Sequence, residues 1–600
     1  MNVTLATITL TTLDWSFIIG FFIIALAIGI YTSRQAGKSE ADFFLGGRTM
    51  PWWLLGFSMV ATTFSTDTPN LVTNLVRENG VSGNWVWWVF LLTGMLTVFV
   101  FSKVWRRSNL TTDIEFYELR YSGKEAAFLR WFRSIYLGVF LNVMIMASVS
   151  LAAIKIGGIM LGLQPWECIV YAAAVTVIFS SLGGFKGVLY TDFLLFIIAM
   201  VGAVAAAHFA LGHEAVGGLS GMMEKFSASS EMESKLNFFP KPGTDGFVTI
   251  LLIPLLIGWW SSWYPGAEPG GGGYLAQRML AAKNERHAVG ATLFFNACHY
   301  ALRPWPWIIV ALCSIIVFPD IDSIKAAFPG AENVANDSAY SAMLTFLPAG
   351  WMGLVLTSLV AAYMSTISTH LNWGSSYIVN DVYLRFLKPK ATQRELVWIG
   401  RLSTVVLMII AGIVALNMES AQKNFELLLK IGAGTGSIYI LRWFWWRVNA
   451  YSEIAGMLMA TLNAFLFWKF DDFGLSGSMP LVASVGITTI GWIVITLITR
   501  PTDTATLRAF AKQTNPGGPG WKKVYRDAEA EGKPIAFLHS ESNIQRGLIC
   551  MIFACGAVYS FLFGTGYYLY GETMAATVCL IVTIISSLLV YKLWSCAEEK

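Results

Sequence analysis

Apolar runs of about 20 residues recur along almost the whole chain, from Leu13 to Trp594. A run of that length crosses the hydrocarbon core of a bilayer as a single helix, and lipid-exposed backbone must satisfy its own hydrogen bonds. Hydrophobic residues make up 55% of the chain and charged residues only 13%, whereas soluble domains carry about 25% charged residues. The sequence therefore predicts an all-α membrane protein embedded in a lipid bilayer.

We predict about fifteen transmembrane helices from the length and spacing of these runs. Two longer polar segments separate some of them. Segment 212–246 has an excess of acidic residues, and segment 500–546 is rich in charged and turn-forming residues. The predicted spans are 13–33, 51–77, 83–102, 133–162, 167–185, 189–211, 247–275, 288–317, 340–383, 397–416, 425–446, 452–468, 480–499, 548–570 and 574–594.

Lysine and arginine predict the orientation, because loops on the cytoplasmic side carry the excess of positive charge. With the N-terminus outside, about 31 basic residues fall on the cytoplasmic side, out of 41 in the chain. We count Arg133 and Arg278 among them. The C-terminus is then cytoplasmic, which requires an odd number of spans. We expect a multi-pass protein of the plasma membrane, specifically a bacterial inner membrane.

Two of the predicted spans contain residues that a membrane helix normally avoids. In the second span, 61–70 holds Asp67, Pro69 and a series of hydroxyl side chains. In the seventh span, 264–274 holds two prolines and a run of glycines. Proline removes a backbone donor and glycine weakens a helix. We predict that both helices are interrupted at membrane depth, where freed carbonyls can hold a cation. The alternative is a harmless kink.

The positions of the two interruptions predict the domain organisation. They lie five spans apart, so each can belong to the first helix of a five-helix unit, and an odd number gives the two units opposite orientations. Such a pair favours an inverted-repeat secondary transporter. The predicted organisation is an extra N-terminal helix and linker (1–50), a first repeat (51–211), an extracellular loop (212–246), a second repeat (247–446) and about four C-terminal helices with a cytoplasmic loop at 500–546 (447–600).

The ninth span presents a row of small and hydroxyl side chains. Ala362, Ser365, Thr366 and Thr369 have the spacing of one helix face, and Ser368 lies beside them. Hard cations prefer oxygen ligands, which this face supplies. The alternative is that these residues only pack one membrane helix against another.

Four separated motifs resemble the solute:sodium symporter family, which includes the sodium/glucose cotransporters. They occur in the order Phe43–Arg48, Gly183–Asp192, Gln277–Lys283 and Asn380–Tyr383. The resemblance extends over about residues 14–500. It implies a leucine-transporter-type fold, a five-plus-five inverted repeat preceded by one extra helix.

The resemblance also implies sodium as the coupling ion and indicates where it binds. A shared sodium site would use backbone carbonyls and hydroxyls, and a second site, found in some family members, would use Asp192. Asp192 is otherwise a capping or snorkelling acid near the cytoplasmic face. The implied ligands are Ala61, Phe64, Ala362, Ser365 and Thr366 for the shared site, and Asp192, Ser365, Ser368 and Thr369 for the second.

The residues around the interruptions are candidates for binding the transported solute. Ionisable groups at membrane depth are functional candidates. Arg303 either holds a carboxylate or forms a structural ion pair with Glu268 or Asp67. Apolar residues near Leu91 and Phe425, where sugar-transporting relatives carry polar ligands, favour an organic anion or zwitterion over a sugar. The substrate candidates are Asp67, Thr68, Asn70, Glu268, Gly271, Arg303, Trp263 and Phe425.

These observations predict a secondary active transporter that moves a small polar organic solute together with sodium ions by alternating access. No catalytic motif or phosphate-binding loop is present, so we expect no enzymatic activity and no nucleic-acid partner. Three alternatives remain: proton coupling through Asp67 or Glu268, a sodium-permeable channel, or a solute sensor. The sequence leaves the solute, the number of sodium ions and the oligomeric state open.

Overall fold

The computed structural model describes residues 10–36, 40–63, 65–261, 268–329, 334–418, 432, 434–475 and 477–595. Helices dominate these residues, and within them the only β-type pairing is an isolated bridge between Met50 and Ala282. Across the same ranges, 11 helices are long and apolar enough to cross a membrane. An all-α membrane protein is therefore confirmed, while the total of fifteen spans and the inverted repeat stay predictions.

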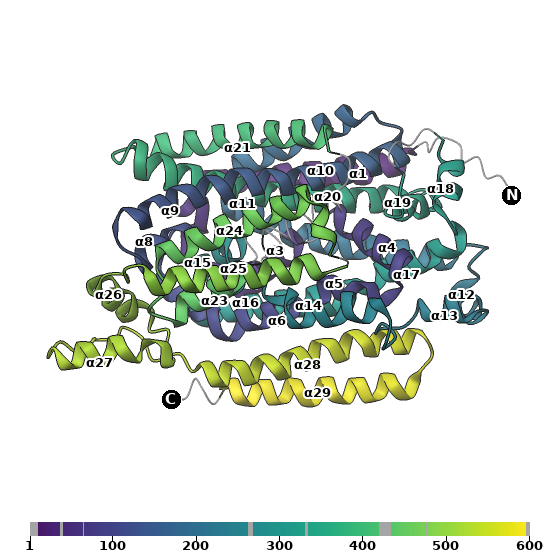
Figure 1. Cartoon of the computed structure of the whole chain (residues 1–600). Coiled ribbons are helices and arrows are strands. Elements are labelled where there is room, and N and C mark those ends of the chain that lie inside the picture. Colours follow the sequence, from purple (N-terminus) through teal and green to yellow (C-terminus); the bar gives the residue numbers. More distant parts are fainter. Residues whose placement is uncertain are drawn as a thin grey trace.

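The helices run roughly parallel to one another in a single bundle (Figure 1). The first half contains α1 Thr12–Ala36, α2 Glu40–Leu45, α3 Trp52–Thr62, α4 Asp67–Asn79, α5 Trp85–Trp88, α6 Leu91–Leu96, α7 Ser102–Ser108, α8 Phe116–Arg120, α9 Gly123–Ile135, α10 Asn142–Leu161, α11 Pro165–Leu211, α12 Gly218–Ser227, α13 Ser230–Ser234, α14 Ile253–Leu256 and α15 Gly273–Ala281. The second half contains α16 Glu285–Ala297, α17 Pro304–Val317, α18 Ile321–Ala327, α19 Ser338–Leu344, α20 Trp351–Ser376, α21 Gln393–Leu416, α23 Gly436–Phe444, α24 Ala450–Lys469, α25 Met479–Ile498, α26 Thr504–Thr514, α27 Lys522–Ala530, α28 Ile544–Leu569 and α29 Thr573–Ser595.

The second predicted span is interrupted as expected. Helix α3 ends at Thr62 and α4 begins at Asp67, so two short helices replace one continuous span. Pro69 lies in the first turn of α4, where its missing N–H costs nothing because that position has no partner inside the helix.

The seventh predicted span is also interrupted. Helical structure ends at Trp260, and α15 begins at Gly273. Gly270 and Gly271 have φ angles of 87° and 86°, a region that residues with a side chain rarely adopt. A Cβ atom on Gly270 would also lie 2.8 Å from the Phe101 ring. The glycines therefore permit both the backbone path and the close packing beside it.

The predicted fifth and sixth spans form one long element, α11, which bends sharply at Gly184. The φ of 55° and ψ of −163° at Gly184 break the helical pattern, so the predicted boundary between the two spans appears as a kink. Helix α20 carries the whole hydroxyl face within 26 uninterrupted residues.

Helix α1 fixes the beginning of α20. The side chain of Asp14 is buried, and its Oδ1 accepts hydrogen bonds of 2.7 Å from the backbone N–H groups of both Gly350 and Gly353. A carboxylate at a helix N-terminus satisfies orphan donors and interacts well with the helix dipole. The predicted extra helix thus contacts the helix that carries the hydroxyl face.

The polar segments lie at opposite ends of the bundle. Helices α12 and α13, from the acidic segment, are at one end, and α26 and α27, from segment 500–546, are at the other (Figure 1). Helices α28 and α29 form a hairpin along the side. Trp305 Nε1 donates a 2.8 Å hydrogen bond to Leu562 O on α28, while only 6% of the apolar stretch of Thr573–Trp594 is buried. That exposure suits a helix that faces lipid.

Candidate functional site

The broken end of α3 lies directly against the hydroxyl face of α20. Thr366 Oγ1 donates a 2.9 Å hydrogen bond to the carbonyl of Thr62, and the hydroxyls of Thr62 and Thr369 are 3.1 Å apart. Ala61 on α3 and Ala362 on α20 are both buried. The structure therefore packs α3, which carries Ala61, against the helix that carries Ala362, Ser365 and Thr366, while Phe64 lies outside the described residues.

Arg303 stabilises the C-terminal end of α3. Its Nη1 donates a 2.7 Å hydrogen bond to Val60 O, and its Nη2 donates one of 3.2 Å to Thr63 O. The last carbonyls of a helix have no partner within it, so the guanidinium supplies donors where the chain departs from helical geometry. Arg303 also lies over the Trp307 ring, 5.1 Å from its centroid.

Asp192 lies in the same region as the hydroxyl face. Ser365 Oγ donates a 2.6 Å hydrogen bond to Oδ1 of Asp192, and Ser58 Oγ donates one of 2.5 Å to Oδ2. Ser368 is adjacent, with its Oγ 3.1 Å from the carbonyl of Ser365. Asp192, Ser365, Ser368 and Thr369 thus come from two helices, α11 and α20, and meet at one place.

A buried arginine completes this group. Arg278 Nη2 lies 3.8 Å from Asp192 Oδ2 and donates hydrogen bonds to Ser58 Oγ at 3.0 Å and to Thr369 Oγ1 at 2.9 Å. The position of Arg278 between two predicted spans indicates a loop residue, but it lies on α15 and is 1% exposed. We call Ser58, Thr62, Asp192, Arg278, Ser365 and Thr369 the hydroxyl cluster.

Sequence reasoning missed both Arg278 and Ser58 as members of this cluster. Arg278 lies within the Gln277–Lys283 motif and follows an interrupted helix, which is a signal that it is held inside the protein. Ser58 lies one helical turn before Thr62, on the same face of α3. The signal for Ser58 is a pair of hydroxyl residues, Ser58 and Thr62, on α3, the helix that packs against the hydroxyl face of α20.

Several solute candidates lie at the start of α4, beside the interruption. Asp67 and Thr68 are partly exposed, whereas Asn70 is 4% exposed. Within the described residues, neither polar atom of the Asn70 side chain has a hydrogen-bond partner, and the hydroxyls of Ser65 and Thr73 also lack one. Buried polar groups normally find partners, so these atoms are suited to binding a solute or water.

Glu268 belongs to a different buried group. Its Oε1 lies 2.5 Å from Nη2 of Arg133, and both side chains are almost fully buried. The alternative ion pair between Glu268 and Arg303 is therefore not formed. Arg133, which we count among the basic residues of the cytoplasmic segments, is not exposed in a loop: its side chain is buried against α8, α23 and the second interruption.

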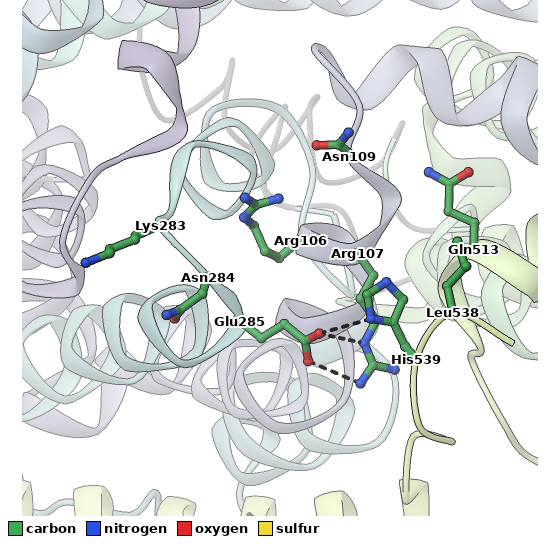
Figure 2. Close-up of a pocket in the computed structure, with 9 residues that line it drawn as sticks. All are labelled: Arg106, Arg107, Asn109, Lys283, Asn284, Glu285, Gln513, Leu538 and His539. Atoms are coloured by element: carbon green, nitrogen blue, oxygen red, sulfur yellow. Dashed lines mark hydrogen bonds and ion pairs between the residues drawn. The ribbon is translucent and has the colours of Figure 1, made fainter.

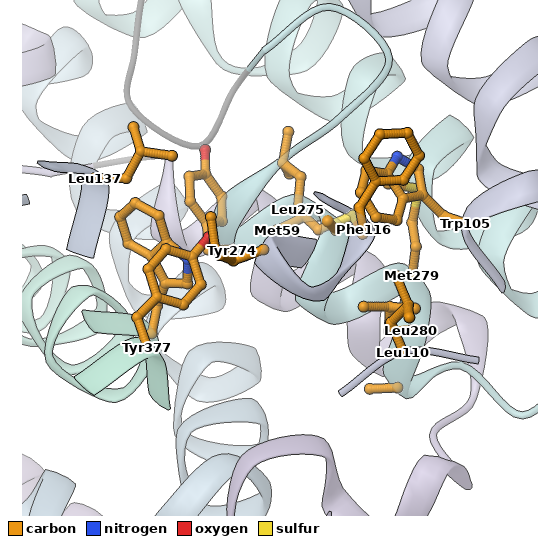
Figure 3. Packing of buried hydrophobic residues seen from close by; sticks show 14 of the residues in the cluster. Met59, Trp105, Leu110, Phe116, Leu137, Tyr274, Leu275, Met279, Leu280 and Tyr377 are labelled. Atoms are coloured by element: carbon orange, nitrogen blue, oxygen red, sulfur yellow. The ribbon is translucent and has the colours of Figure 1, made fainter. Parts of the chain in front are cut away.

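Further contacts extend this group. Arg133 Nε donates to the Tyr117 hydroxyl at 2.9 Å, the Tyr121 hydroxyl donates to Glu453 at 2.6 Å, and Arg442 lies 3.6 Å from Glu453. We call Tyr117, Tyr121, Arg133, Glu268, Arg442 and Glu453 the arginine–tyrosine network. Tyr117 and Tyr121 belong to a buried hydrophobic cluster. Figure 3 shows part of this cluster around Tyr274, Phe116 and Trp105.

The remaining solute candidates are Gly271, Trp263 and Phe425. Gly271 packs close to Met279, whose Cε would lie 2.6 Å from a Cβ at position 271. The carbonyl of Gly270 accepts a 2.8 Å hydrogen bond from Trp105 Nε1. This part of the second interruption is therefore closely packed. Trp263 and Phe425 lie outside the described residues.

A model of the sodium:solute symporter family matches residues 43–460 of the chain. The chain belongs to the sodium:solute symporter family. It is therefore a sodium-coupled solute transporter, with sodium as the coupling ion, as the motifs predicted. The members of this family are transporters.

Curated relatives agree with this assignment. The chain is 24% identical over 504 residues to a sodium/glucose cotransporter of Vibrio parahaemolyticus, covering 79% of this chain and 88% of that protein. It is 25% identical over 487 residues to sodium/myo-inositol cotransporter 2 of Oryctolagus cuniculus, covering 76% of this chain and 69% of that protein.

Among solved structures, a Na+-coupled sialic acid symporter in a substrate-bound outward-open state has the same fold. The TM-score is 0.67 at 18% sequence identity, over 82% of this chain and 99% of that one. This similarity supports the family's leucine-transporter-type architecture for this symporter.

Proposed function

We propose that one sodium ion binds between the broken end of α3 and the hydroxyl face of α20. Its ligands are the carbonyls of Ala61, Phe64 and Ala362 and the hydroxyls of Ser365 and Thr366. The observation that supports this most directly is the 2.9 Å hydrogen bond from Thr366 Oγ1 to Thr62 O, which holds the two helices at a distance that a shared cation can span. Neutral oxygen ligands suit a hard cation.

We propose a second sodium ion at Asp192, Ser365, Ser368 and Thr369. The convergence of these side chains supports it, but Arg278 already lies 3.8 Å from the same carboxylate. A sodium ion and the guanidinium therefore compete for Asp192. Each charge that crosses 100 mV contributes ~2.3 kcal/mol, so a second sodium ion doubles the energy that sodium entry supplies. The second site thus decides how strongly the solute can be concentrated.

We propose that the solute is a small polar organic molecule, with an organic anion or zwitterion favoured over a sugar, and that it binds beside the first interruption. The unpartnered polar atoms of Ser65, Asn70 and Thr73 support the location. An anionic side chain, Asp67, and a cationic one, Arg303, both lie near this interruption. Their presence supports a solute that carries charge. Proton coupling through Glu268 is not favoured, because Arg133 holds that carboxylate.

We propose that transport proceeds by alternating access between two inverted repeats, 51–211 and 247–446, with the N-terminus outside and the C-terminus in the cytoplasm. The placement of α12 and α13 at one end of the bundle and α26 and α27 at the other supports opposite sides of the membrane for segments 212–246 and 500–546 (Figure 1). The basic residues of segment 500–546 then lie inside. A bacterial inner membrane is the proposed location.

Uptake into vesicles that contain the purified protein tests the proposed function. An inward sodium gradient should drive saturable uptake of a solute from a panel of carboxylates, amino acids and sugars, and a potassium gradient should not. Uptake that does not saturate would indicate a channel, and binding without uptake would indicate a sensor.

The role of Arg303 needs a separate comparison, because its replacement also removes donors from the end of α3. Arg303→Lys should therefore be assayed with a transported carboxylate and with the neutral amide of the same molecule. A ligand role predicts that only carboxylate uptake falls, whereas a purely structural role lowers both equally.

A further inference from the structure

A hollow lies at the end of the bundle that carries α26 and α27, away from the proposed sodium sites. It has a volume of about 430 Å3 and is lined by the end of α7, the turn between α15 and α16, and segment 500–546. Its polar lining is predominantly basic, with Arg106, Arg107, Lys283 and His539 facing a single acid, Glu285 (Figure 2).

The single acid of the hollow, Glu285, already interacts with basic side chains. Arg107 forms two hydrogen bonds of 3.1 Å to the carboxylate oxygens of Glu285, and its Nη1 donates to Ser540 O at 3.0 Å. His539 Nδ1 lies 3.6 Å from the same carboxylate. Glu285 pairs directly with Arg107, and its single charge is shared with Arg106, so the cations of the hollow outnumber its acid.

Two cations retain free donors. Arg106 uses only Nε, which donates a 2.7 Å hydrogen bond to Ala282 O. In the described part of the chain, its two terminal nitrogens and the ammonium group of Lys283 form no hydrogen bond or ion pair. Figure 2 shows the guanidinium of Arg106 in the open space between Asn109 and Glu285, with Lys283 at the rim.

A third cation, Arg48, interacts electrostatically with Arg106. Arg48 donates a 2.8 Å hydrogen bond to Leu110 O, while its Nη1 is buried and has no partner among the described residues. Burial, together with the positive charge of Arg106, lowers the pKa of Arg48. The charges of the two guanidinium groups thus repel each other, and the carboxylate of Glu115 opposes this effect at Arg48.

We propose that this hollow is a binding site for a phosphate group. Arginine offers parallel N–H donors that match phosphate oxygens, and lysine adds a mobile positive charge. A dianion would balance the charges of Arg106 and Lys283, and the side-chain amide of Asn109 provides a further donor at the edge. Both a soluble phosphate monoester and the headgroup of an anionic phospholipid present this chemistry.

The site is placed to influence transport. Lys283 N donates to Met50 O at 3.0 Å, and Met50 N donates to Ala281 O at 3.3 Å. Met50 lies two residues before Trp52, where α3 begins, and Ala281 ends α15. These are the two helices that carry Ala61 and Arg278. A phosphate bound here would therefore hold the ends of both interrupted spans.

Segment 500–546 joins the same site to other helices. Gln513, Leu538 and His539 line the hollow, and Trp521 Nε1 donates a 2.8 Å hydrogen bond to Trp443 O on α23. This segment lies beyond residues 43–460, which match the family model. The phosphate site is thus built partly from a region that the family assignment does not cover.

Calorimetric titration of the full-length protein tests this proposal independently of transport. In neutral detergent, the protein is titrated with inorganic phosphate and with glycerol 3-phosphate, each against sodium chloride at equal ionic strength. In a second arm, thermal stability is compared in nanodiscs of phosphatidylcholine with and without phosphatidic acid. Binding in the first arm identifies a soluble ligand, and stabilisation in the second arm alone identifies a lipid headgroup.

The double variant Arg106→Gln with Lys283→Gln should bind the ligand that gives a response with an affinity lower by about tenfold or more. The matched control is Lys522→Gln with Lys533→Gln, which removes the same charge from exposed positions of segment 500–546. The control should bind like the wild type. No response in either arm, or equal responses of the two double variants, would overturn the proposal.

Discussion

The hydroxyl cluster and the arginine–tyrosine network are both buried and charged, but they are built differently. In the hydroxyl cluster, one acid and one arginine are surrounded by serine and threonine hydroxyls, and the charged atoms of Arg278 and Asp192 are 3.8 Å apart. In the network, two arginines meet two glutamates among phenol groups, and Arg133 lies 2.5 Å from Glu268.

This difference indicates two different tasks. A hydroxyl can turn a lone pair toward a cation while its proton remains bonded elsewhere. A buried arginine–carboxylate pair cannot separate without leaving a charge unpaired in an apolar environment. We infer that the hydroxyl cluster is suited to reversible ion binding and that the network holds the second interruption against α8, α9, α23 and α24.

The largest expected effect comes from breaking the network. Arg133→Ala leaves Glu268 buried without its partner and should destabilise the protein by about 3–5 kcal/mol. The check is thermal unfolding of the purified protein, with the exposed Arg526→Ala on α27 as control. The double variant Arg133→Met with Glu268→Met should recover most of the loss, because no lone charge remains. An Arg133→Ala protein as stable as the control would refute the holding role.

Removal of sodium should have the next largest effect. At a sodium concentration about 100 times Kd, bound sodium stabilises the folded protein by about 2.7 kcal/mol. Replacing sodium by choline at equal ionic strength should lower the melting temperature accordingly. The response should persist in the Arg133→Met/Glu268→Met variant and shrink in Ser365→Ala. If the effect of sodium on the melting temperature disappeared in Arg133→Met/Glu268→Met and persisted in Ser365→Ala, the arginine–tyrosine network, and not the hydroxyl cluster, would be the sodium-binding group.

Asp192→Asn tests the second ion. With two sodium ions, the Hill coefficient of sodium-dependent uptake can approach about two, and with one it is limited to about one. Loss of a charged ligand should also weaken sodium binding by about 1.5–3 kcal/mol. Asp322→Asn, at an exposed position of α18, serves as the control. An unchanged Hill coefficient in Asp192→Asn would argue against a second site.

The smallest effect is expected at Thr366. Thr366→Val keeps the shape of the side chain but removes one oxygen, and the sodium concentration for half-maximal uptake should rise about tenfold. Thr366→Ser should restore most of the affinity. Thr404→Val removes a buried hydroxyl of α21 that bonds Gly400 O, and it should leave sodium dependence unchanged. Equal effects of the two valine substitutions would indicate packing rather than coordination.

Much of the fold could be predicted because the features that define it are local. Both interruptions follow from prolines, glycines and hydroxyls placed in apolar runs, and the kink at Gly184 falls between two predicted spans. The hydroxyl face follows from the 3.6-residue period of a helix.

The partners of charged residues could not be predicted in the same way. Arg133 and Glu268 are 135 positions apart, and only tertiary packing brings them together. Their charges look the same in sequence as those of loop residues, so counting basic residues by position placed Arg133 and Arg278 in loops. The acid Asp192 was found only because a family motif contains it.

The carboxylate of Asp14 has a consequence for the geometry of ion binding. It anchors the first turn of α20, and from there an unbroken helix runs to Ala362, Ser365 and Thr366. Each residue turns a helix by about 100°. Deleting one residue between Gly353 and Ala362 would therefore swing these oxygens about a quarter of a turn away from α3, although every side chain would still be present. The N-terminal helix thus sets the rotational phase of the helix face on which the proposed sodium ligands lie.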